Sequence, residues 1–296
     1  MSTVIQNRFM AACVLAIVTL VAPPAHAENF TPSRFSARVE GHGPDVILIP
    51  GLASSRDTYA AEAAKLEVSH RLHLVQIAGF AGEPAGANAQ GEVIAPFVEE
   101  LDRYIKANHL DHPAVIGHSL GGLAGLMLAR RHPEDVSRLM VVDALPFFSV
   151  LVDPNATAAS VAPQAAAMRD RIAAQSDADF AAGQGPAIAR MVLTPEQRPA
   201  VVGWSTASDR SVLARAMYED MTTDMRGELA QIQTPITVLY AFDASMGFPD
   251  AAMDGLWRNA YAAAPHATLT RIDHSYHFIP LDQPEAFDAA VQAFLR

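Results

Sequence analysis

Short apolar runs alternate along this chain with segments in which apolar residues recur at helical spacing. Several of the runs are apolar without interruption, as in strands that are buried on both faces. The predicted strands are Arg34–Val39, Asp45–Ile49, Arg71–Ile77, Ala114–Ile116, Arg138–Val142, Ile236–Tyr240 and Ala267–Ile272. Helices are predicted over Val93–Ala107, Leu120–Arg131, Ala251–Ala264 and Pro284–Leu295. This alternation predicts an α/β fold, with a mostly parallel central sheet and helices on both of its faces.

The connection between the first two predicted strands is short. It reads Gly41-His42-Gly43-Pro44, a composition typical of a tight turn. Strands joined by such a turn can pair directly. We therefore expect these two strands to be antiparallel neighbours.

One long stretch interrupts the alternation. Residues 146–231 contain no convincing strand, and they are rich in Ala, Met, Gln and Arg. A structureless loop of this length is improbable in a compact domain, so the stretch is interpreted as an inserted helical cap. Helices are expected at Pro163–Ala174, Glu196–Trp204 and Ser211–Asp220. The cap would divide the α/β core into residues 28–145 and 232–296. The candidates for its inner surface are Phe147, Phe148, Met168, Met191, Trp204, Met217 and Met221. Of these, Phe147, Met217 and Met221 are the candidate substrate-binding residues.

The first 27 residues have the anatomy of a secretory signal peptide. A single basic residue, Arg8, precedes an apolar stretch from Met10 to Val21, and Ala25-His26-Ala27 forms a small-residue cleavage site. The alternative is a membrane anchor, but an apolar stretch of roughly a dozen residues is shorter than the about 20 that span a bilayer. We therefore expect a periplasmic or secreted protein without stable membrane insertion. Cys13, the one cysteine, lies inside this segment, so the mature chain would have no disulfide.

Composition narrows the range of functions. Half of the residues are hydrophobic, enough for a sizeable core, and the formal net charge is −11. A negative surface repels nucleic-acid phosphates, and the sequence shows no basic cluster, so no nucleic-acid partner is expected. Zinc-ligand spacings and phosphate-binding glycine loops are also missing from the sequence, so no metal or organic cofactor is expected. The oligomeric state stays open.

The residues with the clearest chemistry are Gly117-His118-Ser119-Leu120-Gly121-Gly122. They follow a predicted strand and precede a predicted helix, which is the context of a Gly-x-Ser-x-Gly nucleophile turn. A side chain at either outer glycine would clash with the neighbouring strand or helix, and the turn would lift the hydroxyl of Ser119 above the sheet. The first N–H groups of the helix have no intrahelical acceptor. The Leu120 N–H is therefore expected to face a developing oxyanion.

This turn and three further fragments, in this order along the chain, resemble those of the α/β-hydrolase superfamily. The fragments are Val46–Leu52, Gly79-Phe80-Ala81-Gly82, the Ser119 turn and His277-Phe278-Ile279-Pro280. The resemblance extends over nearly the whole chain after residue 35, and it implies an α/β-hydrolase fold. Many members have His-Gly where this chain has Pro50-Gly51. The glycine is retained, so the resemblance implies that the Leu52 N–H is the second oxyanion donor.

A serine hydroxyl becomes a good nucleophile only when an imidazole accepts its proton, and that imidazole needs a carboxylate to orient it. In this fold the order along the chain is Ser, acid, His. His277 is the expected base because it follows the last predicted strand and precedes the last helix. Its neighbour His274 is the alternative. The resemblance implies a structural role for His118.

The acid is expected after the penultimate strand, Ile236–Tyr240. Asp243 lies three residues beyond it and is the predicted acid, although the same residue could instead cap the following turn. Asp143 is the second candidate because it directly follows the preceding strand, a position that some relatives use. Asp250 and Asp273 are further candidates.

Together these residues predict an exported serine hydrolase that cleaves a small-molecule carboxylic ester, apolar in its acyl part, through an acyl-enzyme intermediate. A serine in place of an aspartate nucleophile argues against a dehalogenase or epoxide hydrolase. The same triad would also hydrolyse an amide, a lactone, a thioester or a carbon–carbon bond, and the fold does not separate these reactions. A small-ligand-binding protein without turnover is the alternative from another class.

Overall fold

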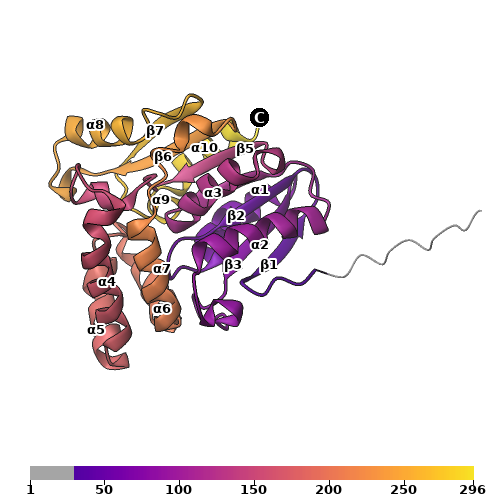
Figure 1. Cartoon of the computed structure of the whole chain (residues 1–296). Coiled ribbons are helices and arrows are strands. Elements are labelled where there is room, and N and C mark those ends of the chain that lie inside the picture. The colour runs from indigo at the N-terminus through magenta and orange to yellow at the C-terminus, as the bar shows by residue number, and fades with distance from the viewer. Residues whose placement is uncertain (1–29) are drawn as a thin grey trace, which may run out of the picture.

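Seven strands form one sheet in the order β1-β3-β2-β4-β5-β6-β7 in the computed structural model, which describes residues 30–296 (Figure 1). The strands are β1 (Phe35–Gly41), β2 (Asp45–Ile49), β3 (Arg71–Ile77), β4 (Ala114–His118), β5 (Arg138–Val142), β6 (Ile236–Phe242) and β7 (Ala267–Asp273). All neighbours are parallel except β1 and β3, so the predicted fold class is confirmed. The predicted signal peptide, residues 1–27, lies outside the described residues.

The expected pairing of the first two strands is wrong. β1 pairs antiparallel with β3, from Phe35 opposite Ile77 to Gly41 opposite Arg71. Both edges of β2 are occupied by parallel strands, β3 and β4. β2 is buried almost throughout, whereas β1 is half-exposed along its length. The uniformly apolar strand therefore takes an interior position, and the amphipathic strand takes the edge.

Alternate residues of the strands serve two separate cores. In β2, Ile47 and Ile49 pack into the larger core, and Val46 and Leu48 pack into the smaller one. The larger core is covered by α2 (Ile94–Ala107), α3 (Leu120–Arg131) and α8 (Asp250–Ala260), and the smaller core is covered by α1 (Ala60–Leu66) and α10 (Pro284–Phe294). The sheet is thus the middle of three layers, and both of its faces are removed from water.

The insertion between β5 and β6 is helical. It contains α4 (Ala158–Ala174), α5 (Asp177–Ile188), α6 (Arg198–Ala207) and α7 (Arg210–Thr222), which lie together beside the sheet (Figure 1). α4 packs on α7, and α5 packs on α6. Glu219 of α7 accepts hydrogen bonds from the N–H groups of Val93 and Ile94, at 2.9 and 2.7 Å. This carboxylate satisfies the free donors at the start of α2 and so ties the insertion to the core.

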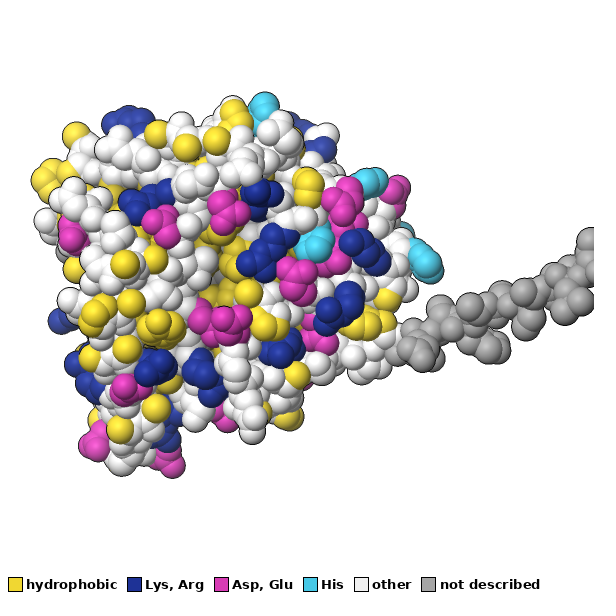
Figure 2. Space-filling view, viewed as in Figure 1, with side chains coloured by type: hydrophobic (Ala, Val, Ile, Leu, Met, Phe, Trp, Pro, Cys, Tyr) yellow, Lys and Arg dark blue, Asp and Glu magenta, His cyan; other side chains and the backbone are white. Residues whose placement is uncertain are grey.

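The surface carries charges of both signs. On the face shown in Figure 2, acidic and basic side chains are interspersed and are not gathered by sign. Within residues 30–296, no helix combines the length and the apolar character needed to cross a bilayer.

Candidate active site

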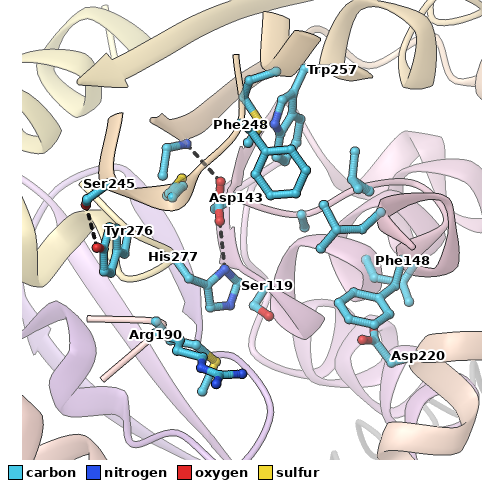
Figure 3. A pocket seen from close by; sticks show the side chains of 18 of the residues that line it. Ser119, Asp143, Phe148, Arg190, Asp220, Ser245, Phe248, Trp257, Tyr276 and His277 are labelled. Carbon is cyan, nitrogen blue, oxygen red and sulfur yellow. Dashed lines mark hydrogen bonds and ion pairs between the residues drawn. The ribbon is translucent and has the colours of Figure 1, made fainter. Parts of the chain in front are cut away.

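Ser119 lies in a sharp turn between β4 and α3. Its backbone has φ 52° and ψ −124°, a conformation that residues with a side chain rarely adopt. A Cβ atom at Gly117 would lie 2.2 Å from the carbonyl oxygen of Gly121, and one at Gly121 would lie 2.3 Å from that of Ile49. Both glycines are therefore required sterically. Figure 3 shows the Ser119 side chain projecting into a cavity beside His277.

Two backbone N–H groups flank Ser119 without an acceptor. Among the described residues, neither the Leu120 nor the Leu52 N–H donates a hydrogen bond. Leu120 is the first residue of α3. A Cβ atom at Gly51, which precedes Leu52, would lie 3.0 Å from the Cβ of Ser119, so this loop passes directly beside the serine. Free donors at this position are suited to bind an oxyanion.

His277 is held by Asp143. The imidazole Nδ1 lies 2.7 Å from Asp143 Oδ2, and the other carboxylate oxygen accepts from the Ala241 N–H at 2.9 Å. Asp143 directly follows β5, and His277 follows β7. Because the carboxyl ends of parallel strands lie at one edge of the sheet, the two side chains meet there with Ser119, as Figure 3 shows.

The expectation that Asp243 orients His277 is contradicted by this geometry. β6 continues through Phe242, two residues beyond its predicted end, and the Asp243 carboxylate turns back to its own loop. Its Oδ1 accepts from the Ser245 N–H at 2.9 Å and from the Ser245 hydroxyl. These bonds hold the pKa of Asp243 below its usual value. Asp243 is thus a turn-capping residue, the alternative that its position after the strand also allowed.

His274 does not reach the serine either. Its side chain is 84% exposed, and its Nδ1 lies 3.6 Å from Asp243 Oδ2. Of the two neighbouring histidines, only His277 lines the cavity that contains Ser119.

His118 packs against His277 and forms a hydrogen bond with its backbone. Its ring is fully buried and lies 4.6 Å from the His277 ring, centroid to centroid. Burial holds the pKa of His118 well below its usual range, and the charge of His277 adds to this effect. The neutral ring donates from Nε2 to the carbonyl oxygen of His277, with a separation of 3.0 Å. His118 therefore fixes the backbone of the residue that faces Ser119.

The cavity has a volume of about 600 Å³ and mainly apolar walls. None of the predicted substrate-binding residues lines it. The Phe147 side chain is fully buried against the guanidinium of Arg226, and Met217 and Met221 lie outside the lining. Phe148, Met191, Phe248 and Trp257 form walls instead, and Asp220 and Arg190 supply charged groups. The insertion does contribute to the cavity, but through Phe148, Arg190, Met191 and Asp220 and not through the three predicted substrate-binding residues.

A further carboxylate joins the loop of His277 to the insertion. Asp282 accepts hydrogen bonds from the N–H groups of Tyr276, Leu193 and Thr194, at 2.9, 3.0 and 2.9 Å. Phe278 also donates its N–H to the Met191 carbonyl at 3.1 Å. No local sequence pattern indicates this contact, because its partners are almost 90 residues apart.

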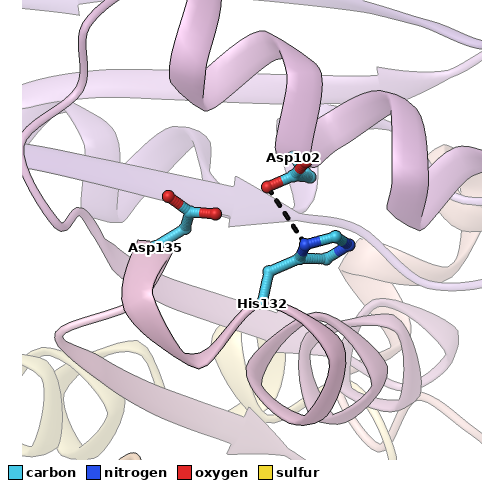
Figure 4. Close-up of side chains that lie close together, drawn as sticks. All are labelled: Asp102, His132 and Asp135. Atoms are coloured by element: carbon cyan, nitrogen blue, oxygen red, sulfur yellow. Dashed lines mark ion pairs between the residues drawn. The ribbon is translucent and has the colours of Figure 1, made fainter.

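Asp102, His132 and Asp135 form a second group of titratable side chains, where α2 meets the end of α3 (Figure 4). Their ligand atoms lie within 4.8 Å of one another. However, a cation is already there, because the Lys106 ammonium lies 2.8 Å from Asp102 and 3.3 Å from Asp135. The group is best described as an ion-pair cluster that joins two helices.

The sheet order and the serine turn define a hydrolase of the α/β class. The chain matches the model of the alpha/beta hydrolase family over residues 46–290, and it therefore belongs to this family.

Curated relatives extend over nearly the full length of the chain. It is similar to a Cronobacter sakazakii protein named for carbamate hydrolysis, RutD, with 25% identity over 85% of this chain and 90% of the relative. It is 29% identical to the pimeloyl-[acyl-carrier protein] methyl ester esterase of Aromatoleum aromaticum, over 84% of this chain and 96% of that protein. Its fold is similar to that of a thermophilic esterase from Thermogutta terrifontis, with a TM-score of 0.72 at 19% identity, over 88% and 93% of the two chains.

Proposed function

We propose that this protein hydrolyses a carboxylic ester through an acyl-enzyme intermediate. Ser119 is the nucleophile, His277 the general base and acid, and Asp143 the carboxylate that orients His277. The N–H groups of Leu52 and Leu120 form the oxyanion hole. The observation that carries the proposal is the 2.7 Å contact between His277 Nδ1 and Asp143 Oδ2 in a cavity that His277 shares with Ser119.

In the proposed steps His277 transfers one proton during acylation and a second one during deacylation. With Nδ1–H donated to Asp143, His277 Nε2 is free to take the proton of the Ser119 hydroxyl as its oxygen attacks the ester carbonyl. The negative charge that develops on the carbonyl oxygen is stabilised by the two backbone donors. His277 then gives this proton to the leaving alcohol. In deacylation His277 takes a proton from water as the water oxygen attacks the acyl carbonyl, and it gives that proton to the Ser119 oxygen as the acid leaves. No metal or organic cofactor enters these steps.

An ester is preferred over the other bonds for two reasons. One relative carries the name of a methyl ester esterase, and the cavity walls are mainly apolar, which suits the hydrocarbon part of an acyl or alcohol chain. A carbamate is the second candidate, favoured by the name of the Cronobacter relative. Its hydrolysis would use the same residues and would pass through a carbamoylated serine. A comparison of kcat/KM for a carbamate and for an ester of the same shape would identify which bond the site prefers.

The experiment that tests the proposal combines labelling with turnover. A fluorophosphonate probe should modify Ser119 in the wild-type protein, and Ser119→Ala should lose both the label and the hydrolysis of short-chain p-nitrophenyl esters while its thermal unfolding is unchanged. Ser245 also lines the cavity, so Ser245→Ala is the matched control and should keep the label. A label that stays in Ser119→Ala, or maps to another serine, would reject the assignment. A folded wild-type protein that binds esters without turnover would instead favour the ligand-binding alternative.

The proposal also includes export, as the first 27 residues suggest. The mature protein would then begin at Glu28 and act outside the cytoplasm on a small molecule. Recovery of a chain that begins at Glu28 from the periplasm or the medium would support export. A full-length chain that stays in the cytoplasm would reject export and leave the chemistry untouched.

A further inference from the structure

Asp220 is a charged group that the proposed mechanism does not use. It lies near the end of α7 and lines the same cavity as Ser119 and His277. Figure 3 shows its carboxyl beside the ring of Phe148, on the side of the cavity opposite Tyr276. The side chain is half-buried.

The Asp220 carboxyl has no partner among the described residues, in contrast to its neighbours. Glu219 accepts from two backbone N–H groups of α2, and Asp224 pairs with Arg226 at 2.6 Å. For Asp220, the described part of the chain provides neither a hydrogen bond nor an ion pair. A carboxyl that is withdrawn from water and unpaired is unfavourable, and such a group in a binding cavity calls for a ligand.

Burial raises the pKa of Asp220 to about 7, although the charge of His277 acts in the opposite direction. This shift means that the surroundings do not stabilise the negative charge well. A cation that entered the cavity would stabilise the negative charge of Asp220, which the protein itself does not pair. A charge-assisted hydrogen bond from an N–H cation is stronger than one from a neutral donor.

We propose that Asp220 is a specificity-determining residue that selects esters carrying a protonated amine. This inference rests on the proposed ester hydrolysis and adds to it the polar group of the substrate. The apolar walls would hold the carbon chain, and Asp220 would pair with the ammonium while the carbonyl lies at Ser119. Among the described residues, Asp220 forms neither a hydrogen bond nor an ion pair with Ser119 or His277, so its role is in binding and not in proton transfer.

Arg190 supplies the opposite charge in the cavity but makes a weaker case for a ligand. Its side chain is exposed, and Figure 3 shows it on the other side of His277 from Asp143. A guanidinium in water stays solvated and needs no ligand, whereas a half-buried carboxyl loses solvation. The structure therefore favours a cationic substrate group over an anionic one.

The test uses pairs of esters that have the same shape and differ only in charge. Methyl 4-(dimethylamino)butanoate and methyl 5-methylhexanoate form the pair on the acyl side. 2-(Dimethylamino)ethyl acetate and 3-methylbutyl acetate form the pair on the alcohol side. Hydrolysis is followed by titration of the released acid at about one pH unit above the pKa of Asp220, so that the carboxylate and the amine are both charged.

In the wild-type protein, kcat/KM should favour the amine in at least one pair. Asp220→Asn keeps the shape and removes the charge, and it should lower that preference by about tenfold or more. Asp220→Leu should do the same and should hydrolyse the alkyl ester at least as well as the wild-type protein does. Asp224→Asn, on the same segment but paired outside the cavity, is the control and should leave the preference unchanged.

The two proposals fail in different ways. If the wild-type protein hydrolyses none of the four esters, the proposed function fails. If it hydrolyses them but Asp220→Asn leaves the amine preference of both pairs unchanged, the role of Asp220 is wrong and the esterase proposal stands. An equal loss of kcat on the alkyl and amine esters would show that Asp220 acts in the chemistry, which also overturns the inference.

Discussion

The loops after β5 and β6 both begin with an aspartate, yet the two carboxylates have different surroundings. Asp143 uses one oxygen to hold the Ala241 N–H and the other to hold His277. Asp243 uses Oδ1 for its own turn, at Ser245, and its Oδ2 lies near the exposed His274. The Ser245 hydroxyl is in turn 2.6 Å from the hydroxyl of Tyr276, so this turn is also linked to the loop after β7. A carboxylate that accepts hydrogen bonds within its own turn is not available to orient a distant imidazole.

The comparison shows that the position of an acid along a strand matters as much as the strand it follows. β6 pairs with β7 as far as Phe242 opposite Asp273, whereas the last residue of β5, Val142, lies opposite Leu239, so Asp243 leaves the sheet beyond the level at which Asp143 leaves it. Asp143 leaves the sheet directly after Val142, whose carbonyl accepts the N–H of Ser119 at 2.9 Å. The acid nearest to the serine is thus the one on the strand next to β4.

The largest effect that would test this comparison is expected for Asp143→Asn. The amide keeps the shape but leaves the imidazole in the wrong tautomer, and kcat should fall by about 10⁴, as it does for the same change in a serine protease. The measurement is kcat on a p-nitrophenyl ester, with thermal unfolding as the control for folding. A loss smaller than that of Asp243→Asn would reverse the assignment.

The loop after β5 allows a second comparison, between the adjacent residues Phe147 and Phe148. Phe147→Ala removes a fully buried ring and should lower the free energy of unfolding by about 3–5 kcal/mol, with little change in substrate preference. Phe148→Ala should shift the preferred chain length of the ester, because Phe148 lines the cavity. Denaturant unfolding and a chain-length series measure the two effects. Equal effects of both changes would contradict the separation of core from cavity.

A smaller effect is expected at His118, at the end of β4. His118→Phe removes the donor that holds the His277 carbonyl, and a shift of the His277 backbone should lower kcat by about 10- to 100-fold. His118→Gln retains an N–H donor and should restore part of the activity. A pH profile of kcat with the same apparent pKa values in all three proteins would support a positioning role. Unchanged kcat in His118→Phe would show that the bond to His277 is dispensable.

The same residue predicts a pH dependence of stability. The pKa of His118 is lowered in the folded protein, so below about pH 6.5 the unfolded chain takes up a proton that the folded protein does not. The stability that the protein gains from keeping His118 neutral is therefore lost as the pH falls, and the free energy of unfolding decreases by at most about 1.4 kcal/mol per pH unit. The melting temperature of the wild type should therefore fall more than that of His118→Phe as the pH is lowered from neutral. A gap that stays constant would contradict the neutral, buried state of His118.

The smallest effect is expected for Asp243→Asn. The amide oxygen can still accept the Ser245 N–H, so the turn should persist, and kcat should change by less than about tenfold. The measurement is the same ester assay that is used for Asp143→Asn. A loss of several orders of magnitude would show that the β6 loop rearranges during turnover and brings Asp243 to the histidine.

The local sequence pattern predicted the strands and the serine turn of this molecule. The seven strands lie within two residues of their predicted bounds, and the turn at Ser119 is as sharp as its flanking glycines indicate. Periodicity shows whether a segment is a strand and which of its faces is apolar. It does not show which strand lies beside which, so the partner of β1 was predicted incorrectly.

The residues that were predicted incorrectly depend on long-range geometry. Whether Phe147 or Phe148 faces the cavity depends on the backbone direction at one point of a loop, where one side chain points to the core and the next does not. The choice between Asp143 and Asp243 depends on where β6 ends relative to Ser119. The connection of the segment after α5 to the His277 loop through Asp282 has no periodic signal at all, because it joins a carboxylate to two distant backbone N–H groups.

The backbone conformation of Ser119 has a consequence for the evolution of this protein. At φ 52° and ψ −124°, a glycine would be more stable than any residue with a side chain, and holding another residue there costs about 1–3 kcal/mol. That cost is a sizeable fraction of the roughly 5–15 kcal/mol by which a typical domain is stable. Selection for stability alone would therefore replace the serine at this position, and only selection for the chemistry of its hydroxyl would retain it.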